Sequence, residues 1–171
     1  FGKRIGDFVE RARAKPWFGQ TLFVIVADHT HKGRGRQELP IENYHIPLVI
    51  YAPGHVAPGK VETIASQIDV SPTVLGLLGF SYTSRFFGQD ILREGRQHPR
   101  ALMANYQTVG YYEKGLTVEL KPNARVRVVD AATGAPVPDS DLTRALTDEA
   151  IAYYQVASEA YKRGDLKRVG R

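Results

Sequence analysis

The sequence predicts an α/β fold in which helices cover a sheet on both faces. Two almost wholly apolar segments, Thr21 to Ala27 and Ile46 to Tyr51, have the composition of strands that are buried on both sides. Amphipathic helices are expected at about 3 to 14 and 142 to 163, and the first runs directly into the first strand, as is typical of α/β folds. We therefore expect both strands in the interior of one sheet, with both helices packed on it.

The composition is that of an ordinary globular protein. With 171 residues, of which 43% are apolar and 24% charged, the chain is long enough for one domain with a sizeable core. No segment approaches the about 20 apolar residues of a membrane span, and no signal-peptide pattern is present, so we expect this chain itself to be soluble. The chain begins inside a helical pattern without Met, which suggests a piece of a longer protein. The absence of Cys excludes disulfides and thiolate metal sites.

The net charge of +5 and the pI of about 9.5 favour anionic partners. The basic residues concentrate in four places, Arg11 to Lys15, Lys32 to Arg36, Arg93 to Arg100 and Lys162 to Arg171. These places lack the stacking aromatic residues of a nucleic-acid groove. We interpret most of the basic residues as solvated surface and expect no nucleic-acid partner.

The first half of the chain alternates helix, strand and loop. Ile5, Phe8, Val9 and Ala12 recur at helical spacing, and Pro16 ends that helix. Residues 30 to 44 contain two Gly, a Pro and five charged side chains, which predicts a surface loop at the rim of a site.

A further helix is expected after the second strand. It begins near Pro72, with Asp69 or Ser71 as its cap, and it ends at Gly79. Phe86 to Leu92 is expected to form a compact turn whose aromatic side chains reach the core.

The second half of the chain predicts antiparallel strands and a closing helix. Leu102 to Tyr112 is strand-like, Leu116 to Leu120 alternates apolar and polar residues, and a similar alternation follows the turn Lys121 to Ala124. We expect these strands to have one solvent-facing side and to extend the edge of the main sheet. Ser140 or Asp141 caps the closing helix, and Gly164 ends it.

The clearest functional signal is Asp28-His29, at the carboxyl end of the first predicted strand. Open α/β sheets bind ligands at this end, and a carboxylate and an imidazole are both ligands for divalent cations. Where a strand breaks into a loop, adjacent side chains can converge on one ion. In the alternative interpretation, Asp28 caps a turn and His29 makes a structural hydrogen bond. Two ligands do not complete a site, and no other carboxylate-His cluster is evident from the sequence.

Four segments in a fixed order resemble a known family. They are TLFVIVADHTH, ENYHIPLVIYAPG, ASQIDVSPTVLGLLG and FFGQDIL, and they are similar to the C-terminal half of the catalytic domain in the alkaline phosphatase and sulfatase superfamily. The branch that the chain resembles most is that of lipoteichoic acid synthase and phosphoglycerol transferase. The later segments NYQTVGYYEKGLTVELKPN and AIAYYQVASEAYKRGDL are also similar to that branch, so the resemblance covers nearly the whole chain.

This resemblance implies a fold and a domain organisation. The fold is a mixed α/β sheet sandwiched by helices, and residues 1 to 171 are the C-terminal portion of one sulfatase-like catalytic domain. The main sheet and its helices occupy about 1 to 95, and a small antiparallel extension with the final helix occupies about 100 to 171. The family also implies a membrane-anchored enzyme with a periplasmic or extracellular catalytic domain, anchored through a segment upstream of this chain.

The resemblance also implies roles for individual residues. Asp28 and His29 match the Asp-His pair that binds a divalent metal ion, which could be Mn, Zn, Ca or Mg. His31 is expected to bind substrate, by a hydrogen bond to phosphate or by aiding the leaving group, with an exposed surface histidine as the alternative. For His45 a structural hydrogen bond is equally compatible with the sequence. Thr30 stands where the family more often has Gly. The nucleophile is expected upstream, so no catalytic residue is assigned here.

We therefore expect a metal-dependent hydrolase or transferase that acts on phosphate or sulfate esters. A phosphoglycerol or phosphoethanolamine transferase would use a Thr nucleophile, whereas a true sulfatase would use a modifiable Cys or Ser. The alternative from another class is a noncatalytic module that binds anionic glycans or lipid headgroups through basic residues. The isolated chain, with two metal ligands, is expected to bind metal weakly, to be inactive and to self-associate through an exposed sheet edge.

Overall fold

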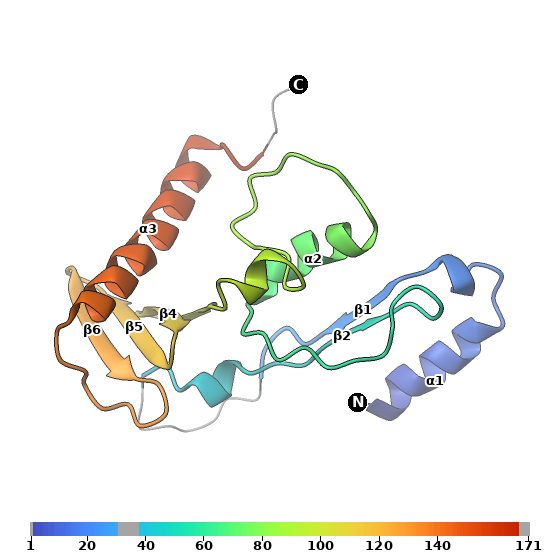
Figure 1. The fold of residues 1–171 in the computed structure, drawn as a ribbon, viewed down its shortest axis with the longest axis horizontal. Coiled ribbons are helices and arrows are strands. Elements are labelled where there is room, and N and C mark those ends of the chain that lie inside the picture. Colours follow the sequence, from blue (N-terminus) through green and yellow to red (C-terminus); the bar gives the residue numbers. More distant parts are fainter. Residues whose placement is uncertain (1, 31–37, 168–171) are drawn as a thin grey trace. The chain divides into compact units, whose positions relative to one another are not determined.

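The computed structural model of the protein describes residues 2–30 and 38–167. The chain divides into two compact units, residues 1–31 with 45–60, and residues 32–44 with 61–171 (Figure 1). Across the described ranges, every helix is too short or too polar to cross a lipid bilayer. The two units are taken in turn below. That they belong to one catalytic domain stays a prediction.

The first unit consists of a helix and a β-hairpin. Helix α1 (Gly2–Arg13) is followed by the short 3-10 helix η1 (Phe18–Gln20) and by strand β1 (Phe23–Val26), and β2 (Leu48–Tyr51) completes the unit. β1 and β2 pair antiparallel, with Phe23 opposite Tyr51 and Val26 opposite Leu48. The first helix lies within one residue of its predicted bounds, and both strands are shorter than predicted.

Aromatic side chains hold the first unit together. The ring of Phe23 lies 6.2 Å from that of Phe8, 5.6 Å from that of Phe18 and 6.1 Å from that of Tyr51, measured between centroids. Tilted and edge-on ring pairs at these distances stabilise a fold beyond their buried area alone. Phe23 therefore fixes α1, η1 and β2 around the first strand.

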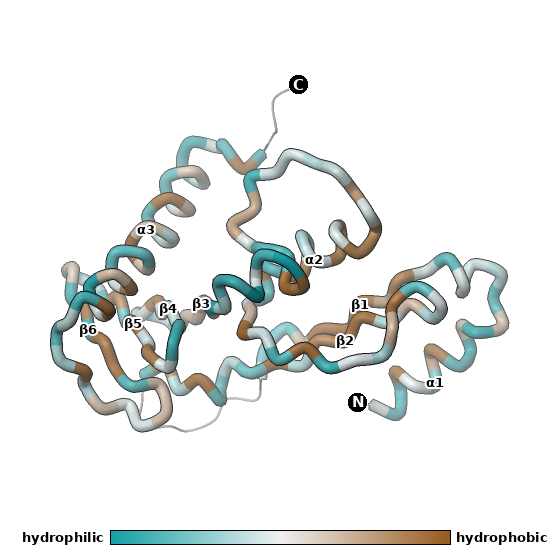
Figure 2. Tube along the Cα trace, in the orientation of Figure 1, coloured by the Kyte–Doolittle hydropathy of each residue, from teal (hydrophilic) through white to brown (hydrophobic). Residues whose placement is uncertain are grey.

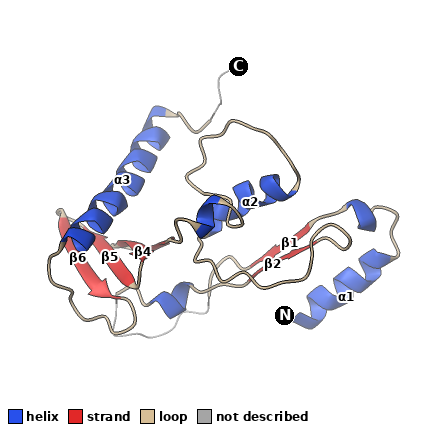
Figure 3. Ribbon diagram, in the orientation of Figure 1, coloured by secondary structure: helices blue, strands red, loops and turns tan. Residues whose placement is uncertain are grey.

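The prediction of two strands buried on both faces in the interior of one mixed sheet is wrong for this chain. β1 and β2 form a two-stranded antiparallel sheet, so each strand is also an edge (Figure 3). Both strands are strongly hydrophobic in Figure 2, yet Val24 and Val26 are exposed, and Val49 is 51% exposed. A continuous apolar run indicates that both faces of the strand favour burial. It does not indicate whether the segments that cover those faces belong to this chain.

The second unit carries a four-stranded antiparallel sheet and most of the helices. Its sheet order is β3-β4-β5-β6. Its elements, in chain order, are η2 (Ile41–Tyr44), η3 (Gln67–Asp69), α2 (Val70–Leu77), η4 (Glu94–Arg96), β3 (Ala101–Ala104), β4 (Val109–Glu113), β5 (Leu116–Lys121), β6 (Arg125–Asp130) and α3 (Asp141–Arg163).

The antiparallel strands are confirmed, and their turns explain the pairing. Lys114 and Gly115 join β4 to β5 with φ angles of 51° and 78°, and positive φ at both central residues is the geometry of a type I′ hairpin turn. These strands were expected to extend the edge of the main sheet, and that prediction is wrong. They form a sheet of their own because each strand pairs with the next one along the chain.

Helix α3 packs on this second sheet and closes its core. Tyr111 and Val118 of the sheet are fully buried against Leu146 and Ala150 of the helix. The side chain of Ser140 caps α3 by accepting a hydrogen bond from the Thr143 N–H at 3.2 Å. The helix was expected on the same sheet as α1, and that prediction is wrong. A 3.6-residue apolar repeat indicates that one face of a helix is buried, but it does not indicate which sheet that face packs against.

Candidate functional site

Asp28 and His29 lie just beyond the end of β1. Ala27 still belongs to the hairpin, because its N–H donates to the carbonyl of Pro47 at 3.3 Å. The chain then turns, and the backbone N–H of His29 donates to Asp28 Oδ1 at 2.9 Å. One carboxylate oxygen thus supports the turn, as the structural interpretation of Asp28 predicted. The other oxygen, Oδ2, lies 3.5 Å from His29 Nε2.

A hydrogen bond at Nδ1 fixes the tautomer of the His29 imidazole. Its Nδ1 lies 2.8 Å from the backbone carbonyl of Thr30. A carbonyl oxygen only accepts, so Nδ1 carries the hydrogen, and in the neutral ring Nε2 has the free lone pair. A backbone carbonyl in this position is the usual outer-shell partner of a metal-binding histidine. The Nε2 that faces Asp28 is therefore oriented as a metal ligand.

The two side chains fit a metal ion that shares them. Ligand atoms at about 2.1 Å from a tetrahedral ion lie about 3.4 Å apart, close to the observed separation of Asp28 Oδ2 and His29 Nε2. The side chains of His29 and Asp28 are 80% and 88% exposed. In the part of the chain that the structure describes, no third carboxylate or imidazole joins this pair. Asp28 and His29 thus offer two ligand atoms, fewer than a metal site requires.

The remaining histidines near the hairpin have different surroundings. His31, predicted to bind substrate, lies outside the described residues, so its role stays a prediction. His45 is exposed at the start of the segment that leads into β2. His55 Nε2 donates to the carbonyl of Gly19 at 3.1 Å, which ties η1 to the segment after β2. We therefore assign His55 a structural role.

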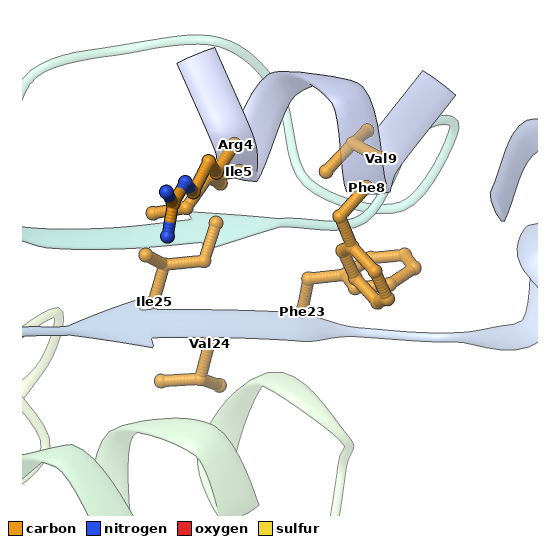
Figure 4. A pocket seen from close by; sticks show the side chains of 7 residues that line it. All are labelled: Arg4, Ile5, Phe8, Val9, Phe23, Val24 and Ile25. Carbon is orange, nitrogen blue, oxygen red and sulfur yellow. The ribbon is translucent and has the colours of Figure 1, made fainter. Parts of the chain in front are cut away.

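The surface hollow beside α1 is separate from this pair. It has a volume of about 320 Å³, and α1 and β1 line it with Arg4, Ile5, Phe8, Val9, Phe23, Val24 and Ile25 (Figure 4). Val24 points to the opposite face of β1 from Phe23 and Ile25 (Figure 4). Arg4 is the single polar side chain among the lining residues, and neither Asp28 nor His29 contributes. A hollow of this composition lacks the groups that ester chemistry requires.

A second group of side chains that could ligate a metal ion lies in the second unit, and it was not evident from the sequence. His98, Glu113 and Glu149 bring one nitrogen and two carboxylate oxygens within 4.8 Å of one another. Burial opposes ionisation of Glu113, but hydrogen bonds with Lys114, Tyr111 and His98 outweigh it and hold the pKa of Glu113 below its ordinary value. The three residues are separated by 15 and 36 positions, so no spacing motif could have revealed them.

Comparisons with known proteins agree with this fold. Residues 3–80, which include Asp28 and His29, match the family model described as Sulfatase. The chain is 27% identical to a protein in the alkaline phosphatase superfamily from Vibrio parahaemolyticus, with a TM-score of 0.78, and the match covers 95% of this chain and 40% of that one. It also resembles Ps i-CgsB in two structures, at 15% and 17% identity, with TM-scores of 0.61 and 0.59 and coverage of 90% of this chain and 40% of each match. One of the two is in complex with k-i-k-neocarrahexaose.

The chain thus spans about 40% of the length of the structures it matches. The likeness to Ps i-CgsB, at its low identity, concerns the fold alone. The likeness to the Vibrio protein extends over both units of this chain, and the family match contains the Asp28-His29 pair. From the fold and these matches we conclude that residues 3–80 are similar to the sulfatase family and that the chain has a partial alkaline phosphatase-like fold.

Proposed function

We propose that this chain is part of a metal-dependent enzyme that cleaves or transfers phosphate or sulfate esters. The observation that carries the proposal is the orientation of His29, whose Nδ1–H is held by a backbone carbonyl while Nε2 faces Oδ2 of Asp28. Both residues lie within the segment that matches the sulfatase family. Their exposure leaves room for an anionic ester and for further ligands.

The two residues have distinct tasks in this proposal. Asp28 supplies negative charge and His29 a neutral nitrogen donor, and Thr30 fixes the tautomer of His29 through its carbonyl. A divalent ion held there would neutralise the anionic ester and lower the pKa of the attacking oxygen. The nucleophile and the remaining ligands would come from outside this chain, since the related structures are more than twice as long. His31 would contact the transferred group.

The finer assignments rest on the sequence. Membership of the lipoteichoic acid synthase and phosphoglycerol transferase branch, and a membrane anchor upstream of this chain, stay predictions. The match to the sulfatase family supports a test with a sulfate ester beside a phosphate diester. The two ester classes are therefore compared directly in the experiment below.

The noncatalytic alternative finds less support. A module that binds anionic glycans or headgroups through charge needs basic side chains that are not already neutralised. Among the described residues, many cations form ion pairs with carboxylates, among them Arg13 with Glu10, Arg144 with Asp139 and Arg163 with Glu159. We therefore favour the enzyme.

The experiment uses the intact protein that carries this chain. Hydrolysis of p-nitrophenyl sulfate and of bis-p-nitrophenyl phosphate is measured after metal removal and again after addition of Mn²⁺, Zn²⁺, Ca²⁺ or Mg²⁺. We expect metal-dependent turnover of one of the two esters, and its identity distinguishes a sulfatase from a phosphotransferase-type enzyme. Turnover that survives complete metal removal, or no turnover of either ester with any of the four ions, would contradict the proposal.

A further inference from the structure

Three side chains from separate elements of the second unit converge on one point. His98 lies between η4 and β3, Glu113 is the last residue of β4, and Glu149 lies in the third turn of α3. His98 Nε2 is 3.1 Å from Glu113 Oε2 and 3.0 Å from Glu149 Oε1. The hydroxyl oxygen of Tyr111 lies 3.3 Å from the same nitrogen. One ring nitrogen thus faces three oxygen atoms.

The ring nitrogen and the two carboxylates share one centre. A ring nitrogen carries one hydrogen at most, so Nε2 can donate to only one of the two carboxylates, and the Tyr111 hydroxyl serves Glu113 Oε2. Two carboxylates around a common centre also repel each other. A cation shared by the three ligand atoms would offset this repulsion, and the atoms lie within 4.8 Å of one another. The arrangement therefore suits a bound ion.

The distances fit a first coordination shell. Nitrogen and oxygen ligands lie about 2.1 Å from Zn²⁺, and two such ligands of a tetrahedral ion are about 3.4 Å apart. The observed separations of 3.0 and 3.1 Å around Nε2 are close to this value, so a small outward movement of the ligands would admit the ion. The side chains of His98 and Glu149 are 38% and 32% exposed, so one side of the group is open to solvent and to a water ligand.

Neighbouring groups already hold the ligands in place. The Tyr111 hydroxyl donates to Glu113 Oε2 at 2.7 Å, and Lys114 Nζ contacts the other oxygen, Oε1, at 2.9 Å. Burial and the hydrogen bond to Glu113 raise the pKa of Tyr111, which keeps its hydroxyl protonated as a donor. The side-chain amide of Gln89 donates to the carbonyl of His98 at 2.6 Å. Outer contacts of this kind orient metal ligands and tune their affinity.

We propose that His98, Glu113 and Glu149 bind a divalent first-row metal ion of the Zn²⁺ type, at a site separate from the Asp28-His29 pair. One imidazole and two carboxylates suit Zn²⁺, whereas Ca²⁺ requires six to eight oxygen ligands that this group does not supply. The ion links α3 to β4 and to the segment before β3. It therefore stabilises the second unit, and the site does not depend on the proposed ester chemistry.

The test measures Zn²⁺ binding by calorimetry and thermal unfolding in a protein whose first pair is removed by Asp28→Asn and His29→Ala. In this background we expect Zn²⁺ to bind and to raise the Tm, because an ion that binds the folded state stabilises it. His98→Ala and Glu149→Gln should each weaken Zn²⁺ binding by more than about 10-fold and abolish the Tm shift. Tyr111→Phe, which keeps the ring and removes the donor, should weaken it by roughly 10-fold.

Two controls separate this site from adventitious surface binding. Glu159→Gln removes a carboxylate of the same helix that lies outside the group, and it should leave Zn²⁺ affinity and the Tm shift unchanged. Ca²⁺ at the same concentration should produce no shift. Zn²⁺ binding that survives both His98→Ala and Glu149→Gln would place the ion elsewhere and overturn the proposal. Absence of Zn²⁺ binding in the background protein would show that the three residues form an ionic cluster only.

Discussion

The guanidinium of Arg100 and the carboxylate of Asp69 form a completely buried, two-pronged ion pair. Nη1 contacts Oδ2 at 2.8 Å, Nη2 contacts Oδ1 at 3.0 Å, and both side chains have no exposed surface. Asp69 also accepts the backbone N–H groups of Ser66 at 2.7 Å and Gln89 at 2.9 Å. The pair thus ties the start of α2, the turn before η4 and the start of β3 to one another.

Breaking this pair should destabilise the protein strongly. Burial disfavours the charged form of Arg100, but hydrogen bonds with Asp69 and Tyr153 outweigh it and raise the pKa of the guanidinium. Asp69→Asn leaves that charge buried without its partner, which costs about 3 to 5 kcal/mol of the free energy of unfolding. Urea denaturation measures the loss. As a control, Arg163→Met removes a surface pair of α3 and should cost less than about 1 kcal/mol. Equal losses in the two variants would contradict the assignment.

Gly88 allows a close backbone approach that a side chain would prevent. A Cβ at this position would lie 2.0 Å from the carbonyl oxygen of Ile68 and 2.5 Å from its carbonyl carbon. Gly88→Ala must shift one of the two segments and should cost about 1 to 3 kcal/mol. Gly59→Ala is the matched control, because nothing lies within 4 Å of its Cβ position. Thermal unfolding of both variants tests the difference, and a Gly88→Ala protein as stable as the Gly59→Ala protein would contradict it.

Glu38 makes stability depend on pH. Hydrogen bonds from Lys121 and Thr108 hold the pKa of Glu38 below its ordinary value. The stabilisation from its ionised form is therefore complete above the ordinary glutamate pKa of about 4.3 and is lost as the pH falls through the lower folded-state value. Glu38→Gln should lower stability at neutral pH and reduce the loss between about pH 5 and 3. Urea unfolding across this range checks the prediction, and an unchanged pH profile would argue against it.

Structure that depends on interactions between neighbours in the chain could be predicted from the sequence, and structure that depends on contacts between distant segments could not. The helices α1 and α3 and the hairpins of the second unit were predictable because periodicity, caps and turns are local. The sheet arrangement was not, because pairing partners and covering surfaces are set by contacts between distant segments. Asp69 illustrates the limit, since it was predicted, with Ser71 as the alternative, to cap a helix. It does occupy the N-cap position of α2, but its side chain makes no cap hydrogen bond there and pairs with Arg100, 31 positions away.

The two candidate sites differ in the same way, since one is formed by neighbouring residues and the other by distant ones. Asp28 and His29 are adjacent in the chain and end an apolar strand, so their position could be inferred from sequence. The tautomer of His29 could not, because it depends on where the carbonyl of Thr30 points. His98, Glu113 and Glu149 come from three separate elements. Only the packing of α3 on the second sheet brings these three residues together.

The most direct test of the proposed function compares two histidine variants of the intact protein. His29→Ala removes the proposed metal ligand, and His45→Ala removes an exposed histidine of the same unit. Ester turnover is measured with saturating metal, beside the free energy of unfolding. We predict that His29→Ala abolishes turnover, that His45→Ala retains it, and that both variants unfold within about 0.5 kcal/mol of the parent, as exposed substitutions usually do. Full turnover by the His29→Ala protein would contradict the proposed metal site.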